Sequence, residues 1–221
     1  MRLVLERSDA CVRLKLNRPD RRNALTEDTV AELLGALDES PGLPVLFGST
    51  DPTIFSAGAD LDVSDNERAR LSDLLYQCYE RMITRPGPVI AIVEGPAVGG
   101  GAQLATAADL RVSSRDARFR WVGPGHGLAV GAWILPSLVG RAAAMDLLLS
   151  SRWLTAEEAY RLGFTGLDDD PWAAAERLLT HLATLDRHAV SRIKSITAAD
   201  GLLQRLADER MGNRTTWSGA V

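Results

Sequence analysis

Lysine, cysteine and aromatic residues are scarce in this chain. Only 2 of its 25 Lys and Arg residues are lysines, aromatic residues make up 5%, and the 2 cysteines are Cys11 and Cys78. The cysteines lie far apart and match no metal-ligand spacing, so we expect no metal site and a reducing compartment. Cys78 falls on the apolar side of a helical pattern, which predicts a place in the core.

Long apolar runs and an excess of basic charge are also missing. No segment approaches the ~18 consecutive apolar residues of a transmembrane helix, and the first residues, MRLVLERSDA, do not resemble a signal peptide. The formal net charge of −4 provides no general basic field for nucleic acid. These absences predict a cytoplasmic protein that neither inserts into a membrane nor binds nucleic acid. The excess of arginine indicates either a GC-rich genome or sites for phosphate oxygens.

Short apolar segments alternate with helical patterns in the first half of the chain. With 221 residues, of which 46% are apolar, the chain is long enough for one domain with a sizeable core. Strands are expected at 3–5, 12–16, 44–47, 89–93 and 110–113, and helices at 30–37, 71–82, 141–149, 155–162, 172–185, 187–196 and 202–211. Thr26 is a candidate N-cap, and Thr155 with Glu158 fits a capping box. The pattern predicts an α/β core with parallel strands over 1–140 and a helical region over 141–221, both within one overall domain.

Two glycine-containing segments are candidates for backbone recognition of a ligand. These are FSAGADL (55–61) and GPAVGGGAQL (95–104), and in each of them small residues follow an apolar strand. Two backbone N–H groups converging there would form an oxyanion hole, helped by the positive end of a helix dipole. Close backbone packing explains either segment alone equally well. The segments match neither a P-loop, a dinucleotide-binding GxGxxG nor a Gly-x-Ser-x-Gly nucleophile elbow.

Together with LNRPDRRNAL (16–25), these segments closely resemble the enoyl-CoA hydratase/isomerase family, the crotonases. Leu128–Gly140 and LTAEEAYRLGF (154–164) follow in family order, so the resemblance covers about 150 residues from Leu14 onward. It implies a spiral ββα-superhelix core followed by a helical C-terminal region. It also implies binding of acyl-CoA thioesters, with coenzyme A as part of the ligand and no separate cofactor. A homotrimer or a dimer of trimers is the assembly that it implies.

The resemblance also assigns roles to individual residues. Ala59 and Gly100 match the two oxyanion-hole amides. Asp60 is expected either to contact the substrate or to have a structural role in a turn or cap. The expected substrate-contacting residues are Ala57, Gly58, Asp60, Leu61, Asp62 and Gly99. The residues that match the region holding the adenine and phosphates of coenzyme A are Arg21, Arg22 and Ala24, with a solvated surface role as the alternative for Arg22.

The sequence departs from the family where its hydratases use two glutamates. Gln103 and Gly123 stand at those positions, and Gly131 stands near the aspartate nucleophile of a family dehalogenase. A general acid or base typically contributes about 10²–10⁴-fold in rate, so hydratase activity is expected to be weak or absent. His126 is a possible substitute acid or base, with an uninvolved loop histidine as the alternative.

Three functions remain open from the sequence. The first is an acyl-CoA-binding protein of fatty-acid or polyketide metabolism that keeps the oxyanion hole without the catalytic dyad. The second is an active enzyme of the family, whether a hydratase, an isomerase or another that forms a thioester enolate. The third is a noncatalytic structural or accessory subunit. Trp121 and Trp133 are expected either to line an acyl pocket or to pack in the core.

Overall fold

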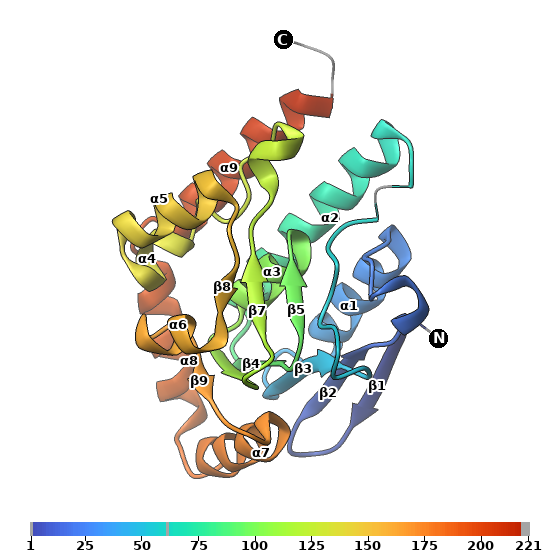
Figure 1. The fold of residues 1–221 in the computed structure, drawn as a ribbon. Helices are drawn as coiled ribbons and strands as arrows, with labels where there is room; N and C mark the ends of the chain where they lie inside the picture. Colours follow the sequence, from blue (N-terminus) through green and yellow to red (C-terminus); the bar gives the residue numbers. More distant parts are fainter. Residues whose placement is uncertain (1, 61, 218–221) are drawn as a thin grey trace.

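The computed structural model describes residues 2–60 and 62–217, which form two sheets surrounded by helices (Figure 1). Leu61, one of the expected substrate contacts, lies outside the described residues. The strands are β1 (Leu3–Arg7), β2 (Val12–Leu16), β3 (Val45–Ser49), β4 (Val89–Val93), β5 (Pro96–Val98), β6 (Leu110–Ser113), β7 (Arg118–Arg120), β8 (Leu154–Thr155) and β9 (Gly166–Leu167). The helices are α1 (Glu27–Glu39), α2 (Asp65–Thr84), α3 (Gly100–Ala107), α4 (Leu135–Val139), α5 (Arg141–Ser150), α6 (Ala156–Arg161), α7 (Pro171–Leu182), α8 (Arg187–Ala198) and α9 (Leu202–Trp217), with short 3-10 helices η1 (Pro19–Arg21) and η2 (Gly123–His126).

The larger sheet has the strand order β1-β2-β3-β4-β6-β9. Only β1 pairs antiparallel, with β2, and every other neighbouring pair is parallel. All five residues of β4 are buried because helices cover both faces of the sheet, and this explains its uninterrupted VIAIV sequence. The predicted parallel α/β core is therefore confirmed.

A second sheet runs beside the first, with the order β5-β7-β8. One strand of each sheet and then a helix follow in turn along the chain, as in β4, β5 and α3, so that the chain winds in a spiral (Figure 1). The preceding turn makes two isolated parallel bridges, from Ser56 to Ala97 and from Leu25 to Ala59. The spiral therefore brings the two glycine-containing segments side by side just before α2 and α3.

Local capping signals set the starts of the helices. The Thr26 hydroxyl accepts a hydrogen bond from the Thr29 amide at 3.3 Å and caps α1, as predicted. A full capping box between Ser64 and Glu67 starts α2 earlier than the expected 71, because its first turns are polar and show no apolar period.

The second half differs from the expectation of helices alone. It contains β8, which joins the smaller sheet, and β9, which joins the larger one. The capping box predicted at Thr155 is only half formed. Its hydroxyl accepts from the Glu158 amide, but the Glu158 carboxylate pairs with Arg152 at 2.7 and 2.8 Å. Bidentate pairing with a guanidinium is the stronger interaction for that carboxylate.

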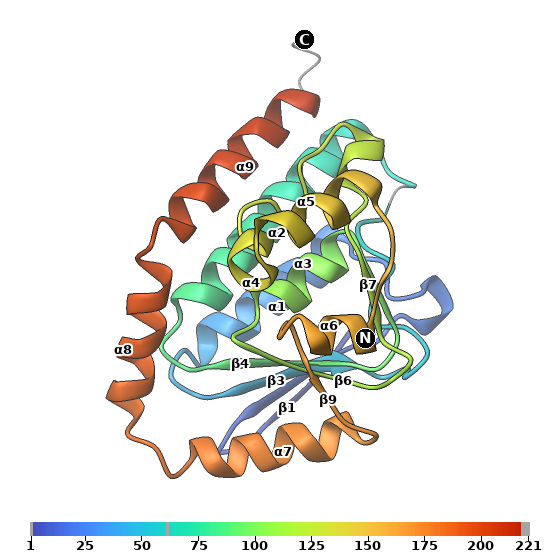
Figure 2. The ribbon, with the colours of Figure 1, turned by 60° about the vertical axis from the view of Figure 1, so that its left-hand side comes forward.

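The C-terminal helices share the core of the first half. Helix α7 covers the face of the larger sheet opposite to α1–α3, and α9 runs beside α2 (Figure 2). Leu206 of α9 and Ala198 of α8 belong to the same buried cluster as β2–β4. None of the described helices is long and apolar enough to cross a membrane.

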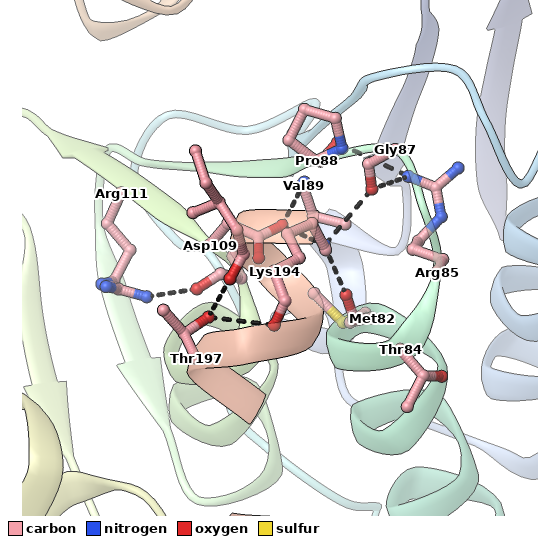
Figure 3. A network of polar contacts seen from close by, with 12 residues as sticks. Met82, Thr84, Arg85, Gly87, Pro88, Val89, Asp109, Arg111, Lys194 and Thr197 are labelled. Atoms are coloured by element: carbon pink, nitrogen blue, oxygen red, sulfur yellow. Dashed lines mark hydrogen bonds and ion pairs between the residues drawn. The ribbon is translucent and has the colours of Figure 1, made fainter. Parts of the chain in front are cut away.

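A buried lysine fastens α8 to the core (Figure 3). The Lys194 ammonium donates to the carbonyls of Met82 and Gly87 at 3.1 and 3.3 Å and pairs with Asp109. Asp109 in turn accepts from the Val89 amide at 2.7 Å, at the start of β4. Burial lowers the pKa of Lys194, and the Asp109 carboxylate opposes that shift. One of the two lysines of the chain is thus a structural anchor.

Candidate functional site

A cavity of about 200 Å³ lies between α2, the start of α3, η2 and α9. Its lining brings together eight of the residues predicted from the sequence, namely Ala57, Gly58, Ala59, Gly99, Gly100, Gln103, Gly123 and His126. The other lining residues are Arg68, Ser72, Leu75, Tyr76, Tyr79, Val122, Leu128, Val130 and Asn213. The pocket is therefore built around the two glycine-containing segments.

Ala59 and Gly100 lie beside each other in the lining of the pocket. Leu25 pairs with the residues on either side of Ala59, through hydrogen bonds with Gly58 and Asp60 at 2.8 and 2.9 Å, so the Ala59 N–H faces away from that bridge. Gly100 is the first residue of α3, where an N–H has no acceptor in its own helix. A methyl group on Gly100 would lie 3.7 Å from the Ala59 nitrogen. Neither amide donates a hydrogen bond within residues 2–60 and 62–217.

Two of the glycines are required by backbone geometry. Gly58 has φ +93°, and a Cβ there would lie 2.8 Å from the Val98 carbonyl oxygen. Gly99 has φ +51°, a region that glycine enters without a steric cost. The Ser56 hydroxyl fixes the first turn because it accepts from the Gly58 amide at 3.1 Å and donates to the Asn23 carbonyl at 2.8 Å.

Gln103 is buried, and its side-chain oxygen is engaged. Its Oε1 accepts a hydrogen bond of 2.7 Å from Nε1 of Trp133. Trp133 and Trp121 are almost fully buried and neither lines the cavity, so both belong to the core. At this position the pocket presents an amide, which stays neutral at ordinary pH and cannot act as a general acid or base.

Gly123 and Gly131 have no room for side chains. A Cβ on Gly123 would lie 2.5 Å from the Leu128 carbonyl oxygen and 2.6 Å from Val130. Gly131 has φ +90°, and a Cβ there would lie 2.7 Å from the Trp121 ring. The local packing therefore excludes a carboxylate at either position.

One wall of the pocket depends on α9, which the sequence did not reveal. The buried Glu209 carboxylate accepts from the Tyr76 hydroxyl at 2.7 Å and from the amides of Gly131 and Trp133 at 3.0 Å each. Asn213 donates to the Tyr76 hydroxyl at 2.8 Å. Burial raises the pKa of both Glu209 and Tyr76, and the hydrogen bonds to Glu209 oppose its shift.

A spacing signal for the α2 wall was present in the sequence. Arg68, Ser72, Tyr76 and Tyr79 recur at intervals of four, four and three, which places them along one helical face. The apolar residues that predict α2 lie beside this face, and they do not by themselves indicate that the polar face lines a pocket. The Tyr79 hydroxyl reaches the Gly100 carbonyl at 3.4 Å.

The remaining predicted residues lie outside the lining. Asp60 has a turn role, since its carboxylate accepts from the Asp62 amide at 3.2 Å and lies 3.9 Å from Arg18. Arg21 is exposed and lies 3.9 Å from Asp62. Arg22 is exposed, with φ +51°, and its carbonyl accepts from the Ala57 amide at 2.9 Å. The carbonyl of Ala24 accepts from Arg18 at 2.7 Å.

Over the described part of the chain, no three His, Cys, Asp or Glu side chains are grouped to hold a metal ion.

Comparison with known proteins identifies the family. The family model described as Enoyl-CoA hydratase/isomerase matches residues 6–199, so the chain belongs to the enoyl-CoA hydratase/isomerase family. "Probable enoyl-CoA hydratase echA6" of Mycobacterium bovis is 37% identical over 212 residues, which are 90% of this chain and 84% of that protein. The crotonyl-CoA hydratase of Syntrophomonas wolfei is 34% identical over 176 residues, 73% of this chain and 66% of that protein.

The fold is shared with solved structures of this family. An enoyl-CoA hydratase/isomerase from Xanthobacter autotrophicus superposes with a TM-score of 0.89 at 26% identity, covering 100% of this chain and 88% of the other. The spiral ββα core predicted from the resemblance is thus confirmed.

Proposed function

We propose that this protein binds an acyl-CoA thioester through the amides of Ala59 and Gly100 and has little or no hydratase activity. The observation that supports this most directly is the chemistry of the pocket, whose described lining includes the amides of Ala59 and Gly100 and no Asp or Glu side chain. Fixed donors of this kind stabilise negative charge on a thioester oxygen. Neither position 103 nor position 123 supplies a general acid or base. Gln103 carries a neutral amide, and the packing around Gly123 leaves no space for a side chain.

Arg21, Arg22 and Ala24 remain the candidates for coenzyme A contacts. The two arginines are exposed beside the segment that enters the pocket, and the guanidinium fork suits phosphate oxygens. We further propose a homotrimer or dimer of trimers in the cytoplasm, in fatty-acid or polyketide metabolism. A protein that binds acyl-CoA in this way without turnover would serve such a pathway as a noncatalytic accessory subunit.

His126 supports an alternative function, that of an active enzyme. It lines the pocket and is exposed, and histidine is the side chain that most often transfers protons in enzymes. It would supply the proton transfer that Gln103 does not.

Calorimetric titration with a panel of acyl-CoA thioesters, with turnover followed in the same samples, tests these proposals. Binding without turnover supports the binder, turnover of crotonyl-CoA supports the enzyme, and no binding across the panel refutes both. Gly100→Pro is the informative variant because proline removes the N–H yet suits the first position of a helix. Gly100→Ala is its matched control, since it keeps the N–H and only presses a methyl against Leu75 at 3.2 Å. We expect Gly100→Pro to weaken binding at least tenfold more than Gly100→Ala.

A further inference from the structure

The outer face of the smaller sheet carries a cluster of basic and aromatic side chains. Phe119 of β7 and Leu154 of β8 are completely buried on the inner face of this sheet, where α3 lies behind it (Figure 1). Successive side chains of a strand point to opposite faces, so Arg118 and Arg120 project together from the outer face, about 7 Å apart along β7. Trp153, which immediately precedes β8, is half-buried beside them.

Both guanidinium groups lie over the same indole. The guanidinium carbon of Arg118 is 4.5 Å from the centre of the Trp153 ring, and that of Arg120 is 5.5 Å from it. These are cation–π distances, and the two cations therefore lie within about 10 Å of each other. Because the indole already holds two long side chains together, they lose less conformational freedom when they bind one ligand.

Neither of these two cations is neutralised by a carboxylate. The Arg118 guanidinium makes no ion pair or hydrogen bond with any residue in the described parts of the chain. Arg120 donates through Nε to the Ser151 carbonyl at 2.5 Å, and its two terminal nitrogens have no acceptor among residues 2–60 and 62–217. A cation–π contact leaves the N–H donors of a guanidinium able to bind an oxygen.

The arginines that adjoin this cluster in the sequence are paired. Arg152 pairs with Asp146 and Glu158 at 2.6 and 2.7 Å, and Arg115 pairs with Asp169 at 3.2 Å. Carboxylates therefore accompany the neighbouring guanidinium groups but not the two that lie over the indole. Two such cations side by side produce a local positive potential that attracts an anion.

We propose that Arg118, Arg120 and Trp153 form a binding site for a phosphate group, separate from the pocket beside Ala59 and Gly100. A phosphate group presents several oxygens and close to two negative charges, and it therefore matches two guanidinium forks better than a single carboxylate does. Since the guanidinium groups already lie over the indole, the site recognises the phosphate and not an aromatic base. The phosphate can come from a separate metabolite or from the nucleotide part of coenzyme A.

Calorimetric titration with inorganic pyrophosphate tests the site. We expect the wild-type protein to bind pyrophosphate and Arg118→Gln to weaken that binding at least tenfold, because the variant lacks one of the two charged donors. Arg118 is exposed, so the variant should fold, and an unchanged midpoint of urea unfolding verifies this. Arg115→Gln is the matched control, since it removes the same charge from an exposed arginine that is paired with Asp169. We expect it to keep the affinity for pyrophosphate within about twofold.

Absence of pyrophosphate binding by the wild-type protein would overturn the inference. Equal weakening in Arg118→Gln and Arg115→Gln would overturn it too, because it would show a general effect of charge. Octanoyl-CoA titrated into the same proteins identifies the source of the phosphate. A parallel loss of octanoyl-CoA affinity in Arg118→Gln supports the site and assigns the phosphate to coenzyme A, and an unchanged affinity supports it and assigns the phosphate to a separate metabolite. Failure of octanoyl-CoA to bind the wild-type protein would refute the proposed function and leave the pyrophosphate result intact.

Discussion

The indole N–H of Trp133 donates a hydrogen bond of 2.7 Å to the side-chain oxygen of Gln103. The buried amide at the start of α3 is thereby tied to the loop after η2. Because this hydrogen bond occupies its oxygen, Gln103 is held in place as a neutral part of the pocket lining.

Gln103→Glu is expected to introduce proton transfer into the site. A carboxylate there keeps the acceptor for Trp133 and lies in the same lining as Gly100. One positioned acid or base contributes about 10²–10⁴-fold, so crotonyl-CoA hydration should rise about 10²-fold above the wild-type background. The rate is measured from the loss of enoyl thioester absorbance, with Gln103→Met as the control. A rate equal to that of the control would show that position 103 does not face the reacting atoms.

Gly123→Ala should destabilise the protein by about 1–3 kcal/mol, the usual cost of overpacking. The new methyl group would meet the Leu128 carbonyl at 2.5 Å and Val130 at 2.6 Å. Urea unfolding measures the change. Gly125→Ala, in the same 3-10 helix but with nothing within 4 Å, is the control and should stay within about 0.5 kcal/mol of wild type. Equal midpoints for the two variants would contradict the packing described at Gly123.

Glu209→Ala should both destabilise the protein and weaken acyl-CoA binding. It leaves the buried amides of Gly131 and Trp133 without their acceptor, and each such loss costs about 1–3 kcal/mol. Tyr76, which lines the pocket, also loses the acceptor of its hydroxyl group and should become less well fixed. Asp208→Ala is the neighbouring control, since Asp208 is exposed and accepts a hydrogen bond of 2.8 Å from the nearby Gln204. Unchanged binding in a folded Glu209→Ala protein would show that the α9 wall does not shape the site.

Acid should release α9 from α2 before the rest of the fold opens. Hydrogen bonds from Arg214 and Arg210 lower the pKa of Asp73 from its ordinary 3.8. A depressed carboxyl pKa contributes stability that is present above pH 3.8 and is lost as the pH falls through the folded value. The protection factors of the α9 amides, which compare exchange with the intrinsic rate at the same pH, should therefore fall below about pH 4. In Asp73→Asn the same amides should exchange faster at neutral pH and respond less to acid.

The sequence was sufficient for the elements whose signals are local. The uninterrupted VIAIV run predicted a doubly buried strand, and Thr26 marked the start of α1. The glycines at 58 and 99–100 were located because close backbone approach needs small residues. The family order of the motifs then gave the spiral arrangement.

What the sequence did not reveal depends on contacts between distant residues. Glu209 lies 133 positions from Tyr76, and nothing in the polar sequence of α9 indicates that its carboxylate is buried. The absence of space at Gly123 depends on how residues 128–130 fold back over it. The strands β8 and β9 were missed because two residues are too few to show a period.

The dependence of the pocket on Glu209 and Asn213 has a consequence for how the protein is made. Those residues follow the glycine-containing segments by more than a hundred positions, so a nascent chain on the ribosome contains strands β1–β9 well before it can close the pocket. Ligand binding should therefore begin only after α9 has been made. Acyl-CoA added during translation would stabilise chains that include α9 and not shorter ones.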